Sequence, residues 1–247
     1  MPDTRGVAAM RRIDLRALVP ERYLLVMNAR AEARLGIRSP TDVHADCQRL
    51  LRAGIGKGDD VLDVGCGNGE LMIALAAVGA RVRGVEIDPT LVDAGRRHGL
   101  EVDLGSAEAL PMPDASVDVV MCSVVVPYTD QRRAVAEWAR VLRPGGRVHV
   151  TYHGVGYGLH YLLAPPEGWR SCVYGARMLL NTVLYELSGT RLPGWIGDTL
   201  CQRDSEMRRA YSRSGFAVTD CVVPDRTLGV PRILFHALRR GGGTAAG

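Results

Sequence analysis

Hydrophobic and polar positions form blocks along the chain that predict strands and helices in turn. Short apolar runs rich in Val are separated by longer stretches in which apolar residues recur at helical spacing. Such short runs are typical of buried parallel strands, and the longer stretches are typical of amphipathic helices. The expected strands are 61–64, 81–86, 101–104, 117–123 and 147–152, and the expected helices between them are 69–78, 90–98 and 131–142.

Two more strands are expected near the end of the chain, at 216–223 and 232–238. Only the connector 224–231 separates them, which predicts an antiparallel hairpin at one edge of the sheet. The regular alternation before this hairpin calls for a parallel sheet with helices on both faces. The predicted fold is α/β: a doubly wound, Rossmann-like, mostly parallel seven-stranded sheet with an antiparallel C-terminal hairpin.

The segments around this core are expected to cover it. A long irregular piece inside a compact domain is usually functional, and the piece after the fifth strand is rich in Tyr, His and Trp. We therefore expect an inserted lid there, with an apolar helix at 171–187. The expected organisation is 1–54 as an N-terminal arm with cap helices, 55–152 as the cofactor-binding core, 153–200 as the lid and substrate region, 201–240 as a C-terminal helix and hairpin, and 241–247 as a disordered tail.

A glycine-rich turn at 65–69 follows the first strand of the core and precedes a helix. This arrangement is typical of a nucleotide site, because glycines let the backbone approach a ligand and the helix presents free N–H groups. A dinucleotide motif would need glycine at position 70, where the chain has Glu70. Glu70 and Asp63 would repel a diphosphate. S-adenosylmethionine (SAM) fits better, since it has no phosphate and carries an ammonium and a sulfonium.

The turn resembles motif I of the class I SAM-dependent methyltransferases, and further stretches resemble later motifs of that family in order. These are 84–89, 105–114, 118–123 and the turn at 140–148, so that the resemblance covers about 55–152. It is greatest to the small-molecule branch, which includes ubiquinone-type and natural-product enzymes. Glu86 follows the first glycine by about 20 residues, where an acid can bridge ribose hydroxyls.

The resemblance implies a SAM site at the ends of the first, second and fourth strands. Asp63, Gly65 and Gly67 would hold the methionine part, Glu86 the ribose, and Ile87 the adenine. Ser106 stands where the family usually has Asp, and a hydroxyl accepts a weaker hydrogen bond than a carboxylate. The expected cofactor-binding residues are Asp63, Gly65, Cys66, Gly67, Glu86, Ile87, Ser106, Ala107 and Ser123.

The lid region supplies the candidates for catalysis. His153 follows the fifth strand, and ligands of open α/β sheets lie outside the carboxyl ends of the strands. A neutral imidazole can accept the proton of an attacking hydroxyl or amine, although alignment alone can supply most of the catalysis of methyl transfer. The catalytic candidates are His153, Tyr157 and His160, with Asn68 and Asp130 less favoured; the substrate candidates are Tyr23, Tyr128, His153 and Tyr157.

Composition restricts the remaining possibilities. With 47% hydrophobic and 23% charged residues, the chain is an ordinary globular protein. The net charge is +4, and the arginines are scattered in pairs instead of forming a stripe, which disfavours nucleic acid as a partner. The six cysteines are widely spaced, so we expect no metal site, and we expect no signal peptide, no membrane span and a cytoplasmic location.

Together these features predict a SAM-dependent methyltransferase that acts on an O, N or C nucleophile of a small, fairly apolar or aromatic metabolite, as in natural-product biosynthesis. The oligomeric state stays open. Three alternatives remain: an RNA or protein methyltransferase, which should show a basic groove; a nicotinamide dehydrogenase, which should prefer glycine at position 70; and a non-catalytic protein with this fold.

Overall fold

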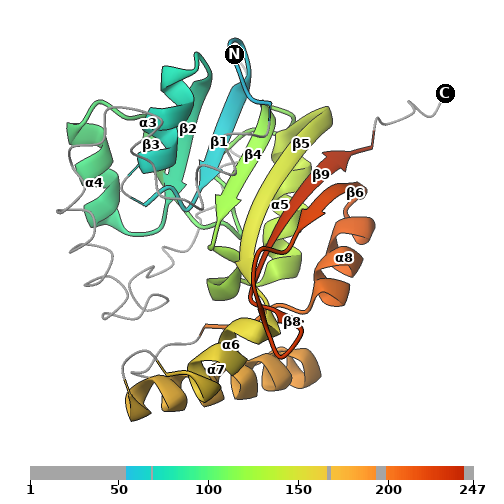
Figure 1. The fold of residues 1–247 in the computed structure, drawn as a ribbon. Coiled ribbons are helices and arrows are strands. Elements are labelled where there is room, and N and C mark those ends of the chain that lie inside the picture. Colours follow the sequence, from blue (N-terminus) through green and yellow to red (C-terminus); the bar gives the residue numbers. More distant parts are fainter. Residues whose placement is uncertain (1–53, 68, 166–167, 193–198, 242–247) are drawn as a thin grey trace, which may run out of the picture.

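The computed structural model describes residues 54–67, 69–165, 168–192 and 199–241 (Figure 1). The expected N-terminal cap helices, the candidates Tyr23 and Asn68, and the tail from residue 242 lie outside the described residues. The expected fold class is confirmed: the main sheet has seven strands in the order β3-β2-β1-β4-β5-β9-β6.

The first five strands of the sheet are parallel, and β9 pairs in antiparallel fashion with both β5 and β6. A two-stranded β7–β8 ribbon lies within the connector that joins β6 to β9. The strands are β1 (Asp60–Val64), β2 (Arg81–Glu86), β3 (Val102–Leu104), β4 (Val117–Ser123), β5 (Leu142–His153), β6 (Phe216–Val222), β7 (Arg226–Thr227), β8 (Val230–Pro231) and β9 (Ile233–Arg240).

Helices cover both faces and the lower end of the sheet in the view of Figure 1. Their starts follow local chemistry: the Asp88 side chain accepts from the Thr90 amide at the start of α4, where Pro89 occupies the first turn. The helices are α3 (Glu70–Ala77), α4 (Pro89–Arg97), the 3₁₀ turn η3 (Val126–Tyr128), α5 (Gln131–Val141), α6 (Val155–Leu163), α7 (Trp169–Ser188) and α8 (Asp204–Arg213).

The largest apolar cluster lies on the face of the sheet that α5 and α8 cover. Its fully buried side chains include Leu62 of β1, Tyr152 of β5, Trp138 of α5 and Tyr211 of α8. A smaller cluster joins Val61 and other strand residues to α3 on the opposite face. Burial on both faces explains why the central strands read as nearly continuous apolar runs.

The α6–α7 hairpin lies at the carboxyl ends of the parallel strands, and α7 is its outer layer (Figure 1). The two helices approach closely at glycines: a Cβ at Gly175 would lie 2.8 Å from the carbonyl oxygen of Gly158. The helix expected at 171–187 is therefore present as α7, whereas α6 was not expected. Its segment contains Gly156 and Gly158, which lower intrinsic helix propensity, so packing stabilises this helix.

The expected turn at residues 144–146 is a bulge inside β5. Leu142 pairs with Val117 and Arg147 pairs with Val119, so four residues of β5 lie opposite one residue of β4. Gly145 has φ of +78°, a backbone conformation that favours glycine. The strand therefore begins five residues earlier than the apolar pattern predicted, because its first pair precedes the polar bulge.

Candidate functional site

The glycine turn joins the carboxyl end of β1 to α3, and its conformation depends on glycine. Gly65 has φ of +70° and Gly67 has φ of +56°. The amides of Gly65 and Cys66 donate to the carbonyl oxygen of Val85 at 2.7 and 3.2 Å, which ties the turn to β2. A Cβ at Gly65 would lie 2.2 Å from Cγ2 of Val125, so no larger residue fits this position without a shift.

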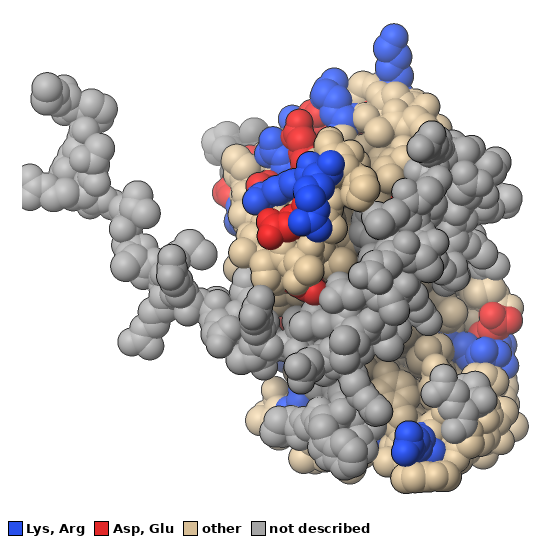
Figure 2. Space-filling view, turned by 90° about the vertical axis from the view of Figure 1, so that its left-hand side faces the viewer, with Lys and Arg blue, Asp and Glu red and all other residues tan. Residues whose placement is uncertain are grey.

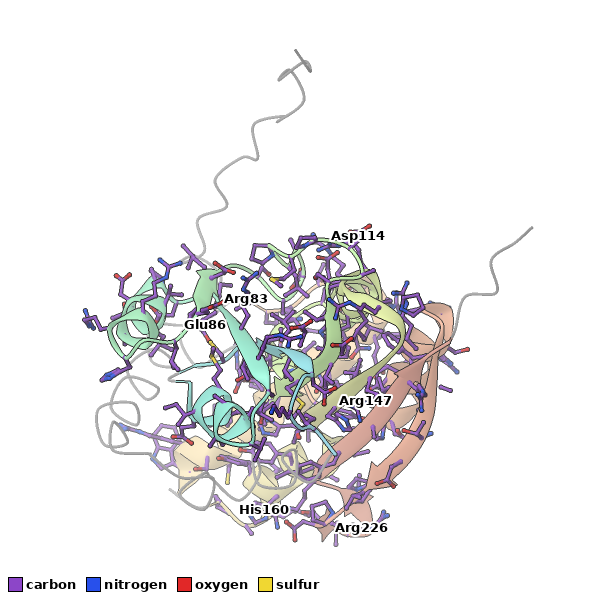
Figure 3. The ribbon with its side chains drawn as sticks, turned by 90° about the horizontal axis from the view of Figure 1, so that it is seen from above. Arg83, Glu86, Asp114, Arg147, His160 and Arg226 are labelled. Atoms are coloured by element: carbon purple, nitrogen blue, oxygen red, sulfur yellow. The ribbon has the colours of Figure 1, made fainter. Side chains whose placement is uncertain are left out.

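Glu86 ends β2 directly beside this turn (Figure 3). Its Oε2 accepts from the Gly67 amide at 2.9 Å, and its Oε1 accepts from the amides of Ile87 and Asp88 at 2.7 and 3.1 Å. Burial raises the pKa of Glu86, while these backbone hydrogen bonds act in the opposite direction. The carboxylate is thereby held in one position between the ends of β1 and β2.

Asp63 lies on β1 immediately before the turn and is buried. Burial, and then the nearby Glu86 carboxylate, raise the pKa of Asp63 to about 7. A neighbouring cation would reverse this effect by favouring the charged carboxylate. The site therefore combines a glycine turn with two acids, one of which changes its protonation state near neutral pH.

Cys66 occupies the middle of the turn and faces into the protein. A Cβ at Gly84 would lie 2.6 Å from its Sγ, so the thiol fills space against β2. Burial raises the pKa of Cys66, which keeps the group a neutral thiol. The side chain of Cys66 thus shapes the turn, and only its backbone remains a candidate for contact with a ligand.

The loop after β3 lies beside the end of β2, because the Gly105 amide donates to the Glu86 carbonyl at 2.9 Å. Ser106 Oγ accepts from the amide of Glu108 at 3.1 Å, which closes the loop on itself. Ala107 is buried and Ile87 is half-buried. The structure thus brings Glu86, Ile87 and the 105–107 loop to one end of the sheet, as the sequence predicted.

The end of β4 contributes a feature that the sequence did not indicate. Val124, directly after Ser123, has φ of +59°. A β-branched residue in the left-handed region is strained, and such strain gathers at functional sites. This conformation turns the chain so that Val125 packs on Gly65. A run of three valines gives no sequence signal for such a turn, because it reads as strand.

His153 and Tyr157 lie together where β5 passes into α6. Their rings stack at a centroid distance of 3.8 Å and an interplanar angle of 7°. Burial lowers the pKa of His153 to about 4, so the imidazole is neutral at physiological pH. Its Nδ1 is buried and has no hydrogen-bond partner among the described residues. Burial raises the pKa of the Tyr157 phenol, which therefore stays protonated.

The other lid candidates are placed differently. His160 meets the edge of the Tyr161 ring at 6.3 Å, on the α6 side of the molecule and apart from Glu86 (Figure 3). Tyr128 is half-buried at the end of η3. Asp130 caps α5, since its Oδ1 accepts from the Arg132 amide at 2.9 Å, and this contact accounts for the residue without a role in chemistry.

Gln202 is a further polar residue of this region that the sequence did not point to. The backbone amide of Gln202 donates to the His153 carbonyl at 2.8 Å, and Gln202 is 2% exposed. Its Nε2 lies 3.5 Å from the carbonyl oxygen of Val126, while its Oε1 has no partner within the described ranges. An isolated Gln outside any motif gives no sequence signal for such a position.

The face drawn in Figure 2 carries charges of both signs. Blue and red side chains mix on its described upper part. Arg81 pairs with Asp60 at 2.6 Å, and Arg83 lies 3.5 Å from Glu101. These arginines of the described residues are thus paired with acids. Among the helices of the described ranges, none has the length and apolarity needed to cross a membrane.

Comparison with known proteins agrees with this geometry. Residues 62–150 match the family described as Methyltransferase domain. A probable S-adenosylmethionine-dependent methyltransferase of Mycolicibacterium smegmatis is 45% identical over 92 residues, which cover 36% of this chain and 36% of that protein. The ubiquinone biosynthesis O-methyltransferase of Xylella fastidiosa is 34% identical over 102 residues, which cover 38% of this chain and 42% of that protein.

Solved structures extend the likeness beyond the matched segment. The geranyl diphosphate C-methyltransferase of Streptomyces coelicolor A3(2), solved with Mg²⁺, geranyl diphosphate and S-adenosyl-L-homocysteine, has a TM-score of 0.59 at 18% identity. The match covers 79% of this chain and 78% of that one. At this identity the likeness establishes the fold.

The sheet order and the position of the glycine turn define a Rossmann-like methyltransferase fold. Within this class, residues 62–150 match the methyltransferase domain family, and this segment is similar to proteins named as SAM-dependent methyltransferases. The chain spans only 36% and 42% of the length of the two curated relatives. The reaction and substrate of the whole protein are therefore matters for proposal.

Proposed function

We propose that the protein transfers the methyl group of SAM to an O, N or C nucleophile of a small, fairly apolar or aromatic metabolite. One observation carries the proposal: the Glu86 carboxylate is held by the Gly67 amide at 2.9 Å, between the glycine turn and the loop after β3. A carboxylate held in this way would be a fixed acceptor for ribose hydroxyls, and glycines would let a ligand approach the backbone beside it.

The residues present fit SAM better than a dinucleotide. Two buried acids, Asp63 and Glu86, flank the turn, and they would disfavour a diphosphate while favouring an ammonium. Gly65 leaves no room for a side chain, since Val125 lies against it. The turn therefore suits a ligand that meets main-chain groups and carboxylates, as the methionine part of SAM would.

Each residue has a role that follows from its position. When bound, SAM supplies an electrophilic methyl group on a sulfonium. Asp63 in its charged form would accept from the ammonium, and Glu86 would accept from the ribose hydroxyls. Ile87 and Ala107 would pack against adenine, with Ser106 beside them, and Ser123 would lie near the methyl group at the end of β4.

His153 is the favoured base. SAM would supply the methyl group and leave as the neutral thioether, and Nδ1 of His153 would take the proton that the acceptor atom loses. The buried, neutral imidazole with an unpartnered Nδ1 supports this assignment. An aligned acceptor that loses its proton to water would not need His153. Substitution of His153 would therefore slow methyl transfer only if His153 acts as the base.

The acceptor class rests on the rings around His153. His153 stacks on Tyr157, Tyr157 lies 5.1 Å from Tyr161, and Tyr161 meets Tyr174 at 5.3 Å, measured between ring centroids. A row of four rings suits a planar or apolar acceptor. The names of the relatives support a small molecule, because ubiquinone biosynthesis and geranyl diphosphate occur among them.

Calorimetry of SAM binding tests the cofactor site. Glu86→Ala should weaken SAM binding by about 5- to 30-fold, which is the cost of one or two charge-assisted hydrogen bonds. Glu101→Ala removes an exposed acid at the start of the β3 region and should leave affinity unchanged. Equal affinity for SAM in the wild type and in Glu86→Ala would contradict the assignment of Glu86 to the ribose hydroxyls.

Transfer of labelled methyl from SAM into an extract of the native host tests the acceptor class. We expect label in the organic-soluble, low-mass fraction. Label in RNA or protein would retain the cofactor assignment and overturn the small-molecule acceptor. Absence of transfer with intact SAM binding would favour a non-catalytic role for the domain.

A further inference from the structure

The outer face of α7 carries an apolar stripe. Its exposed members are Trp169, Val173, Ala176, Leu180, Val183 and Leu187. Trp169 is 72% exposed and Leu187 is 81% exposed, and the side chains between them at positions 173, 180 and 183 are 41–50% exposed. Single exposed apolar residues are ordinary, but a contiguous row on one helix is typical of an interaction surface.

The spacing of the stripe is that of a helix–helix seam. The steps between its members alternate between four and three residues along the whole of α7. This is the heptad pattern of paired helices, and at 1.5 Å per residue it runs for about 27 Å. The opposite face of α7 packs inward through Met178, Asn181 and Thr182, which are buried. The stripe is therefore additional to the packing that holds α7 on the protein.

Of the charged residues of α7, Arg170 lies over the Trp169 ring at 5.8 Å at the first end of the stripe, and the other two lie beside the stripe. Arg177 donates to the carbonyl oxygen of Leu192 at 2.6 Å. Glu186 pairs with Arg203 at 3.1 Å. These contacts hold both side chains beside the stripe, so a second helix can reach the apolar row without desolvating either charge in its centre.

The stripe is also self-complementary. In an antiparallel pair related by a two-fold axis at the middle of α7, Trp169 lies opposite Leu187 of the other copy, Val173 opposite Val183, and Ala176 opposite Leu180. Each large side chain near the axis thus meets a small one. A two-fold dimer needs one surface that complements itself, and this helix face meets the requirement.

We propose that the protein forms a two-fold dimer in which α7 packs antiparallel against α7 of a second copy. The exposed parts of the stripe, with Leu162 and Leu163 at the neighbouring end of α6, amount to several hundred Å² of apolar surface. This is comparable with the roughly 800 Å² that each partner buries in a standard interface. The size and symmetry of the surface favour a second copy over a short peptide.

Sedimentation equilibrium of the full chain tests the dimer. The wild type should sediment as a dimer at micromolar concentration, and Leu180→Arg and Val183→Arg should weaken association at least 100-fold with little change in melting temperature. Leu228→Arg is the matched control, since Leu228 is 80% exposed but lies in the β7–β8 turn and is not a member of the stripe. A monomeric wild type would overturn the proposal.

Cross-linking tests the antiparallel register. The double variant Val173→Cys/Val183→Cys should form a covalent dimer on mild oxidation, while the two single variants should not, since each new thiol faces the other position. These single variants also control for native cysteines such as Cys221, which is exposed. Cross-linking of a single variant to itself would contradict the antiparallel arrangement.

Two further outcomes would also overturn the dimer. Flotation of a monomeric wild type with vesicles of anionic lipid, lost in Leu180→Arg, would assign the stripe to a lipid surface. A monomeric wild type whose melting temperature falls in Leu180→Arg would indicate that another segment of the same chain covers α7.

Discussion

The cofactor half and the lid half of the candidate site are built in opposite ways. Around the glycine turn, the Glu86 carboxylate accepts three backbone amides, and its position is fixed before any ligand arrives. Around α6, Nδ1 of His153 and Oε1 of Gln202 are buried without hydrogen-bond partners among the described residues. The Glu86 carboxylate is held by backbone amides, whereas the buried His153 and Gln202 atoms have no such partners within the described ranges.

This difference separates what the domain shares with its relatives from what distinguishes it. Buried polar atoms without partners are costly, so their presence near the proposed acceptor suggests that an acceptor satisfies them. Glu86 and the glycine turn lie within residues 62–150, which match the methyltransferase domain family, whereas His153 and Gln202 lie outside them. Substitutions in the two halves should therefore act on different steps.

The largest effect is expected for Gly65→Ala. The added Cβ would lie 2.2 Å from Val125 Cγ2 in a backbone with φ of +70°. Left-handed backbone costs about 1–2 kcal/mol for alanine, and overpacking adds about 1–3 kcal/mol. We expect a loss of about 2–5 kcal/mol in the free energy of unfolding, measured in urea, together with loss of detectable SAM binding by calorimetry.

Gly229→Ala is the matched control for this variant. Gly229 has φ of +79°, but no atom lies within 4 Å of its built Cβ. Gly229→Ala should lower the free energy of unfolding only by the cost of left-handed backbone, about 1–2 kcal/mol, and should leave SAM binding intact. If Gly65→Ala cost no more than Gly229→Ala, the contact between the turn and Val125 would not be a constraint on the cofactor half.

Asp63→Asn should have the next largest effect, and its sign depends on pH. The pKa of Asp63 rises from 3.8 to about 7 on folding, so its contribution to stability is complete below pH 3.8 and is lost as the pH rises through 7. At about 1.36 kcal/mol per pKa unit, the loss is about 4 kcal/mol. Asn does not titrate, so the variant should gain this amount relative to the wild type between pH 4 and 8.

Urea unfolding of both proteins across this pH range measures the difference. Asp93→Asn, on the exposed side of α4, should leave the pH dependence of stability unchanged. SAM binding supplies a second readout: the wild type should bind more tightly as the pH rises through 7, because Asp63 pairs with the ammonium only when charged. A pH-independent affinity would argue against Asp63 as that partner.

The cofactor half and the lid half also differ in how well the sequence predicted them. The strand ends, the glycine turn and Glu86 were predictable because local chemistry determines them: glycine for left-handed backbone, and an acid at the end of β2. Val124 and Gln202 were not, because strain at Val124 and burial of Gln202 arise from contacts between segments far apart in the chain. Helix α6 was missed for the same reason, since its glycines disfavour a helix locally and serve its contact with α7.

His153→Phe tests the lid half and should act on turnover. Phe keeps the ring that stacks on Tyr157 at 3.8 Å and removes the nitrogen. We expect kcat to fall about 100-fold, near 2.7 kcal/mol, as for loss of a general base, with SAM affinity unchanged. The pH profile of the wild type adds a signature: burial lowers the pKa of His153 to about 4, so kcat should stay level down to about pH 5.

His160→Phe is the control, because His160 meets Tyr161 at its edge and does not stack on Tyr157. It should retain kcat within about threefold. Equal kcat for His153→Phe and the wild type would show that methyl transfer here needs alignment without a base. A wild-type kcat that declines from pH 6.5 downward would place the titrating group elsewhere.

Ser106→Ala should have the smallest effect on stability and on SAM affinity. It tests whether the Ser106 hydroxyl binds the ligand or only the loop. Ser106 Oγ already accepts from the Glu108 amide at 3.1 Å, so the hydroxyl contributes to the loop, and its loss should cost about 0.5–1 kcal/mol of stability. Adenine would then depend on Ile87 and the backbone of Ala107, and SAM affinity should change by less than about threefold. Ser116→Ala, which removes a hydroxyl that donates to the Pro113 carbonyl at 2.7 Å, gives the same stability readout away from the site. A tenfold loss of SAM affinity in Ser106→Ala alone would show that the Ser106 hydroxyl hydrogen-bonds the ligand in addition to the Glu108 amide.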